Sequence, residues 1–251
     1  MTTTSPLPSK GILPSLFFLL LLAALAFTSR QNTLTDNILS YTVDPKTHTI
    51  QFYWKNDKGE VLQSIGNLKS YLESKNQELL FAMNGGMYME NLSPLGLFIQ
   101  NSKTMTKLNL KHGSGNFYLK PNGVFYLTND NTPVVCQTAS FTNNGNIKYA
   151  TQSGPMLVFD GKINPQFVKG SKNTNIRNGV GILPNNKVVF AISKQPVNFY
   201  DFALYFQNLG CKNALYLDGF VSRMYLPAKQ WIQTDGDFGV MIGVTKKKPN
   251  T

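Results

Sequence analysis

Short apolar runs alternate with clusters of glycine, asparagine and proline along most of the chain, a pattern that predicts many β-strands. The clearest run is Ala214–Leu217, whose mostly apolar character is typical of a strand buried on both faces. It leads directly into Asp218 and Gly219. The other predicted strands cover residues 38–43, 49–54, 79–83, 95–100, 116–120, 124–128, 133–138, 147–152, 156–159, 179–183, 187–193 and 240–244.

Two segments show helical spacing instead. One lies around residues 67–76. The other begins after Asn198, a residue type that caps helix N-termini, and ends at Gly210. Its apolar stripe is expected to pack into the core and consists of Phe199, Phe202, Ala203, Phe206 and Leu209. Strands outnumber helices, so the sequence predicts a single α+β domain with a mixed or antiparallel β-sheet core.

Two turns predict β-hairpins. The turn Pro121-Asn122-Gly123 would join residues 116–120 to residues 124–128, with Asn-Gly supplying the reversal. The turn Pro184-Asn185-Asn186 would join the strand that ends at Leu183 to the strand that begins at Lys187.

The N-terminal region differs from the rest. Residues 11–28 carry no charge, Lys10 precedes them and Arg30 follows. The dense apolar core and the Ala24-Leu25-Ala26 segment indicate a signal peptide, and the alternative is an uncleaved membrane anchor. We therefore divide the chain into residues 1–30 and a domain of residues 31–251, which we expect to be exported to the periplasm or cell envelope.

The net charge is +11, and the positive residues are dispersed rather than gathered between aromatic residues. This distribution argues against nucleic-acid binding and favours anionic envelope material as a partner. Cys136 and Cys211 either form one disulfide in an oxidising compartment or lie buried as two small apolar side chains. Two histidines give no basis for a histidine metal cluster or a Ser-His-Asp triad.

Four segments share one arrangement, in which a strand is followed by glycines and polar side chains. They are Asn84–Tyr88, Gln152–Pro155, Arg177–Gly181 and Leu217–Arg223. Glycines allow a ligand to approach the backbone and expose N–H groups to an anion, and arginine recognises phosphate through two parallel hydrogen bonds. The candidate site residues are Asn84, Gly85, Gly86, Tyr88, Ser153, Gly154, Arg177, Asp218, Gly219, Ser222 and Arg223.

In this order, the four segments resemble the phosphodiester glycosidase family, whose pattern is Asn-x-Gly with an aromatic residue, Ser-Gly-Pro, Arg-x-x-x-Gly and Leu-Asp-Gly. The resemblance covers about residues 80–244, and residues 115–124 look like the bacterial exported branch. The family includes the lysosomal uncovering enzyme, which removes N-acetylglucosamine from a phosphodiester on mannose. That branch has a second glycine where this chain has Phe220, a side chain that can narrow the sugar pocket or stack on a sugar ring.

The resemblance implies cleavage between a sugar anomeric carbon and a phosphate oxygen. Arg177, with Arg223, would hold the phosphate and neutralise its charge as it leaves. Asp218 would act as a base, a nucleophile or a stabiliser of the oxocarbenium-like transition state. Asn84 and Ser153 would orient the sugar or the phosphate through hydrogen bonds.

Several alternatives remain open at this point. Most glycosidases use two carboxylates, and Glu90 is the candidate for the second. Asp218 can instead ligate a divalent cation, but the sequence shows no carboxylate cluster, so no cofactor is predicted. The expected partner is a phosphorylated glycan or a sugar phosphodiester, and an uncleaved N-terminus would add the membrane. The alternatives to an enzyme are a non-catalytic periplasmic protein that binds anionic glycans and a membrane-tethered structural domain in which Asp218 pairs with Arg177.

Overall fold

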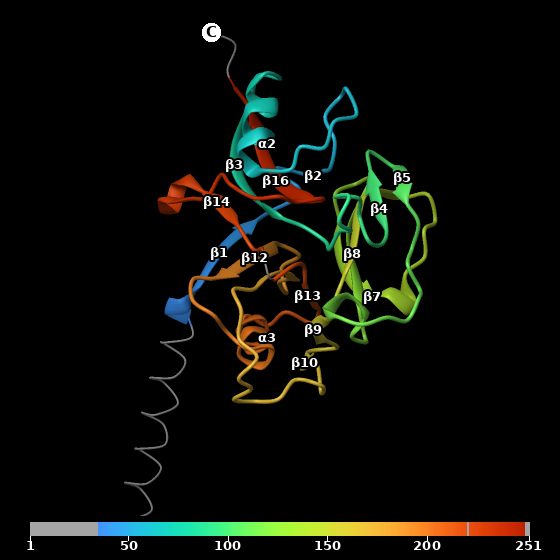
Figure 1. The fold of residues 1–251 in the computed structure, drawn as a ribbon, viewed down its shortest axis with the longest axis vertical. Helices are drawn as coiled ribbons and strands as arrows, with labels where there is room; N and C mark the ends of the chain where they lie inside the picture. Colours follow the sequence, from blue (N-terminus) through green and yellow to red (C-terminus); the bar gives the residue numbers. More distant parts are fainter. Residues whose placement is uncertain (1–34, 220, 249–251) are drawn as a thin grey trace, which may run out of the picture. The chain divides into compact units, whose positions relative to one another are not determined.

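The computed structural model describes residues 35–219 and 221–248 of this 251-residue protein (Figure 1). From Ile38 onward the described residues form one compact unit. The predicted signal peptide or anchor, residues 1–30, and Phe220 lie outside the described residues. Within the described ranges, no helix combines the length and the apolar character that crossing a membrane requires.

In the described part of the chain, the strands form three antiparallel sheets. The first has the order β1-β12-β11-β13-β9-β10, the second β15-β14-β3-β16-β2, and the third β5-β4-β8-β6-β7. In the order given, the strands of the first sheet cover Ile38–Val43, Val188–Ser193, Asn178–Ile182, Ala214–Tyr216, Met156–Phe159 and Lys162–Ile163. Those of the second sheet cover Trp231–Ile232, Met224–Leu226, Gln77–Asn84, Met241–Lys247 and Thr49–Tyr53. Those of the third sheet cover Lys103–Thr106, Phe98–Gln100, Ile147–Ser153, Gly123–Thr128 and Pro133–Gln137.

Among the described residues, two α-helices, α2 and α3, lie against these sheets. Helix α2 (Ile65–Glu73) packs beside β3, and helix α3 (Phe199–Asn208) packs beside β9 and β10 (Figure 1). The Asn198 side chain accepts the Asp201 N–H at 2.9 Å, and Gly210 takes the left-handed conformation that ends α3. Three short 3₁₀ helices, η1, η2 and η3, cover Asn116–Tyr118, Thr138–Ser140 and Pro227–Lys229. The predicted α+β single-domain class is confirmed.

The core lies where the three sheets face one another. Phe190 of the first sheet stacks on Phe81 of the second, with ring centroids 5.0 Å apart. The Phe125 ring of the third sheet lies 5.9 Å from Phe190 and 5.3 Å from Phe52. These four aromatic side chains are fully buried, so strands far apart in the sequence share one apolar core.

One predicted hairpin is wrong. Residues 116–118 form η1, and β6 pairs with β7 and β8 rather than with the segment before it. Asn122 does not reverse the chain, because its side-chain amide donates to the Phe117 carbonyl at 3.0 Å and its own carbonyl accepts the Thr138 N–H. The second predicted hairpin is confirmed, since β11 pairs with β12 from Ile182 to Asn178.

The two cysteines are free thiols in the structure. Cys211 is buried and Cys136 is partly buried, and burial raises the pKa of the Cys136 thiol to about 11. Both side chains therefore match the second of the two sequence alternatives, that of small apolar groups.

Candidate active site

The candidate site begins where β13 ends, at Leu217 and Asp218. The Leu217 N–H donates to the Asn178 carbonyl at 3.2 Å, and the Asp218 N–H donates to Asn178 Oδ1 at 2.8 Å. On the β8 side, the Ser153 hydroxyl donates to the Leu217 carbonyl at 2.5 Å. The backbone that carries the Asp218 carboxylate is therefore fixed by residues at the ends of β11 and β8.

Two buried asparagines connect the ends of β3 and β11 to this carboxylate. The Asn178 amide donates to Asn84 twice, to its carbonyl at 3.0 Å and to its Oδ1 at 2.9 Å. Asn84 Oδ1 also accepts the Arg223 N–H at 2.9 Å. With its oxygen held by two donors, Asn84 must turn its NH₂ group outward, and Nδ2 donates to Asp218 Oδ2 at 3.4 Å.

The environment of Asp218 changes its acidity. Burial raises the pKa of the Asp218 carboxyl to about 6, and the Gly219 N–H and the Asn84 amide limit the rise. The Tyr88 hydroxyl donates to the Asp237 carbonyl at 2.5 Å. Burial and the nearby charges of Asp218 and Asp237 raise the pKa of the Tyr88 hydroxyl to about 12. A carboxyl group with a pKa near 6 can both lose and regain a proton near neutral pH.

Arg177 occupies a different position from the one that a phosphate clamp at the surface would take. Its side chain is 0% exposed, and its guanidinium carbon lies 3.6 Å from the centre of the Phe199 ring. Nε donates to the Val197 carbonyl at 2.8 Å, and Nη2 donates to the Asn173 carbonyl at 3.0 Å. Nη1 donates to the Tyr216 hydroxyl at 3.3 Å. Within residues 35–219 and 221–248, no carboxylate forms an ion pair with the Arg177 guanidinium. The structure therefore does not show the Asp218–Arg177 pair that one of the sequence alternatives required.

Ser222 and Arg223 follow Asp218 and support its backbone. The Ser222 hydroxyl donates to the Asp218 carbonyl at 2.5 Å. The Arg223 guanidinium is partly exposed and forms an ion pair with Asp235, with Nε 2.9 Å from Oδ2. Arg223 is thus the more accessible of the two predicted phosphate-binding arginines, but a carboxylate already contacts it.

The glycines of the predicted motifs are explained by close packing. Gly85 donates its N–H to the Val240 carbonyl at 2.7 Å, so this group is not available to an anion. A Cβ atom on Gly86 would overlap the Thr151 side chain, and one on Gly154 would lie 2.6 Å from the Asn122 Cβ. At Gly219 an added Cβ would overlap the Tyr216 hydroxyl, and its φ lies outside the left-handed region. Close approach, rather than a positive φ, therefore accounts for the glycine after Asp218.

We expect Gly219→Ala to lower the free energy of unfolding by about 1–3 kcal/mol, the usual cost of overpacking. Adding Tyr216→Phe should recover part of this loss, because it removes the hydroxyl oxygen but leaves the ring Cζ only 2.6 Å from the added Cβ. Urea unfolding of the two single variants and the double variant measures the coupling. A Gly219→Ala protein as stable as the wild type would contradict the packing explanation.

Sequence reasoning missed residues that connect the predicted ones. Asn178 follows Arg177 directly, so its place inside a predicted motif was an available signal. Tyr216 lies two residues before Asp218 on β13, and nothing in the apolar run distinguished its hydroxyl. Glu90, the proposed second carboxylate, is exposed. Over the described residues, no three His, Cys, Asp or Glu side chains come together in a way that could hold a metal ion.

Residues 77–245 match the family model described as phosphodiester glycosidase. The chain therefore belongs to the phosphodiester glycosidase family. In sequence, the chain is 38% identical over 239 residues to the uncharacterised protein YigE of Escherichia coli strain K12, covering 95% of this chain and 93% of that protein.

Solved structures resemble the fold. The catalytic domain of zebrafish N-acetylglucosamine-1-phosphodiester alpha-N-acetylglucosaminidase, auto-inhibited by its pro-peptide, aligns with a TM-score of 0.57 and 15% identity, covering 83% of this chain and 82% of that one. A putative exported protein of Burkholderia pseudomallei K96243 aligns with a TM-score of 0.55 and 10% identity, covering 82% and 73%. At these identities the likeness concerns the fold.

Proposed function

We propose that this protein is a hydrolase of glycosyl phosphodiesters that cleaves the bond between a sugar anomeric carbon and a phosphate oxygen. The observation that carries the proposal is the Asp218 carboxylate at the end of β13, with a pKa of about 6 and the Asn84 amide aimed at it. Membership of the phosphodiester glycosidase family supports the choice of substrate class.

The chemistry follows from these groups. Above pH 6 the Asp218 carboxylate faces the positive charge that develops at the anomeric carbon, which it stabilises or attacks. The bond to the phosphate oxygen breaks with its electron pair going to the phosphate, and water supplies the new oxygen on the sugar. A phosphate ester leaves readily, so one carboxylate suffices for the step. Arg177, which no described carboxylate neutralises, adds positive potential that favours a phosphate group.

Cellular location is part of the same proposal. The uncharged segment at residues 11–28 supports export of the domain at residues 31–251 to the periplasm or cell envelope. If the segment is retained, it ties the domain to the membrane. A phosphorylated glycan of the envelope is then the substrate within reach, and the net charge of +11 favours such an anionic partner.

The test is turnover of a panel of sugar-1-phosphodiesters that differ in sugar and anomer, followed as free reducing sugar. The full-length protein is used in a detergent without a sugar head group. We expect turnover that rises with pH through about 6, because the ionised form of Asp218 is the active one. Saturable binding of these diesters without any product would instead favour the non-catalytic glycan-binding alternative.

A further inference from the structure

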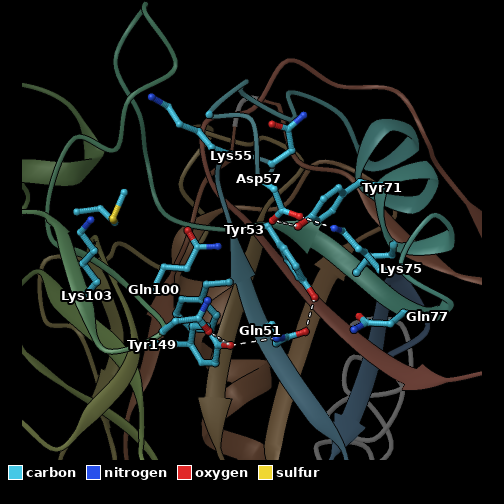
Figure 2. Close-up of a pocket in the computed structure, with 16 residues that line it drawn as sticks. Gln51, Tyr53, Lys55, Asp57, Tyr71, Lys75, Gln77, Gln100, Lys103 and Tyr149 are labelled. Carbon is cyan, nitrogen blue, oxygen red and sulfur yellow. Dashed lines mark hydrogen bonds and ion pairs between the residues drawn. The ribbon is translucent and has the colours of Figure 1, made fainter.

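A cleft of about 490 Å³ lies among β2, α2 and the β4–β5 hairpin (Figure 2). Gln77, the first residue of β3, lines it, whereas Asn84, the last residue of β3, contacts Asp218. Because a strand rises about 3.3 Å per residue, the two ends of β3 are roughly 23 Å apart. The cleft is therefore distinct from the candidate active site.

A chain of hydrogen bonds fixes the polar floor of this cleft. The Tyr53 hydroxyl donates to Gln51 Oε1 at 2.7 Å, and Gln51 Nε2 donates to the Tyr149 hydroxyl at 3.1 Å. The Tyr149 hydroxyl donates to Asn101 Oδ1 at 2.7 Å. Figure 2 shows the first two of these bonds across the base of the cleft. Burial raises the pKa of the Tyr53 hydroxyl, so the floor stays neutral at physiological pH.

One acceptor in the lining has no protein partner. Gln77 Oε1 is buried, and within the described residues no donor reaches it. The side chains of Gln100 and Asn56 add further amides to the wall. Amide groups and tyrosines, which combine an apolar ring with a polar hydroxyl, are the side chains that suit a ligand rich in hydroxyl groups.

The charged residues of the lining are mostly positive. Lys75 is paired with Asp57, which also accepts the Tyr71 hydroxyl at 2.7 Å. Lys55 lies over the Trp54 ring, 4.3 Å from its centre, and Lys103 of β5 stands across the cleft from Lys75 (Figure 2). The lining contains three lysines and one aspartate, so its net positive charge favours an anionic ligand.

We propose that this cleft is a binding site for an anionic oligosaccharide, with the amides and tyrosines contacting sugar hydroxyls and Lys55 and Lys103 contacting a phosphate or carboxylate group. The proposal goes beyond hydrolysis at Asp218. In a hydrolase, such a site holds the glycan chain away from the bond that is cleaved and raises its effective concentration at the active site. In a non-catalytic protein, the site binds the same class of ligand.

The experiment is calorimetric titration of the full-length protein, in a detergent without a sugar head group, with mannohexaose bearing 6-phosphate groups. Hexagalacturonate tests the carboxylate form of the ligand; neutral mannohexaose and inorganic phosphate are the comparisons. We expect one or both anionic hexasaccharides to bind more tightly than either comparison. Lys103→Glu should weaken this binding about fivefold, in line with about 1 kcal/mol for an exposed charge pair.

Two controls identify the site. Lys162→Glu makes the same charge change at an exposed position of β10, and it should leave the affinity unchanged. Asp218→Asn should also leave it unchanged, which separates the cleft from the active site whether or not the protein hydrolyses glycosyl phosphodiesters. Loss of binding in Asp218→Asn but not in Lys103→Glu would overturn the proposal. So would neutral mannohexaose or inorganic phosphate binding as tightly as the anionic hexasaccharides.

Discussion

Replacing Asp218 by asparagine should abolish hydrolysis while making the folded protein more stable at pH 7.5. The variant keeps the size of the side chain but cannot carry the negative charge that the anomeric carbon requires. We expect turnover to fall by at least about 10³-fold, comparable to the loss when a charge-stabilising group is removed from an active site. The measurement is release of reducing sugar on the best phosphodiester of the panel.

The gain in stability follows from the raised pKa. Burial raises the pKa of Asp218 to about 6 in the folded state, against about 3.9 in an unfolded chain. The folded protein therefore holds this proton more tightly, so the contribution of Asp218 to stability is most favourable below the unfolded pKa and becomes less favourable as the pH rises through about 6. Partial exposure of the side chain reduces the effect, and we expect Asp218→Asn to gain about 1–2 kcal/mol at pH 7.5. This gain should shrink at pH 4.5.

The matched control is Asp160→Asn. Asp160 also follows a predicted strand and precedes a glycine, but it lies exposed in the turn after β9. Because its side chain is exposed, this variant should leave turnover unchanged and the free energy of unfolding at pH 7.5 within about 0.5 kcal/mol of wild type. Full turnover in a folded Asp218→Asn protein would remove Asp218 from the mechanism. A stability difference between Asp218→Asn and wild type that does not vary with pH would contradict the raised pKa.

Arg177→Met should lower the free energy of unfolding by about 2–3 kcal/mol. The change removes the Arg177 donors from the Tyr216 hydroxyl and from the Val197 and Asn173 carbonyls. The Val197 carbonyl keeps the Asn175 N–H at 3.2 Å and Asn173 is exposed, so the Tyr216 hydroxyl bears most of the cost of about 1–3 kcal/mol for a buried polar group that loses its partner. Relief from burying a cation offsets part of this cost. Urea unfolding at pH 7.5 gives the value directly.

The comparison with Arg223→Met distinguishes a framework arginine from a ligand-binding one. The Arg223 side chain is partly exposed and pairs with Asp235, so its loss should cost no more than about 1 kcal/mol. Arg223→Met should instead weaken binding of the phosphodiester if this side chain contacts the phosphate. Arg177→Met with wild-type stability and lost substrate binding would show that Arg177 is a direct phosphate ligand and that its hydrogen bonds to the framework contribute little.

Local pattern predicted the elements well where local interactions form them. Helix α3 begins after Asn198 and ends before Gly210 because both caps act within one turn of the helix. The same reasoning failed at Asn122-Gly123, because the Asn122 amide bonds to Phe117 and Gly123 joins β8 and β7. The β7 and β8 partners of Gly123 are distant in the sequence, and no local rule contains them.

The candidate site was only partly predictable for a related reason. Asn84 and Asp218 were identified from motifs 134 positions apart in the chain, and the structure places the Asn84 amide against the carboxylate. Arginine is rarely buried, so no feature of the sequence indicated that Arg177 lies fully inside the fold. The cleft lined by Gln51 and Lys103 escaped prediction because polar residues on separate strands look like ordinary surface until the strands are assembled.

The sequence by itself determined the strand-rich α+β class, the presence of helices α2 and α3, the caps of α3, and the motifs that mark the family. These depend on interactions within a few residues or on the identity of side chains at fixed spacing. Only the tertiary structure decided which glycines pack against a neighbour and which arginine is buried. It also decided that burial raises the pKa of Asp218 and that the Asn84 amide limits the rise. Those properties depend on burial and hydrogen bonding between distant segments, and both exist only after the three sheets close around their common core.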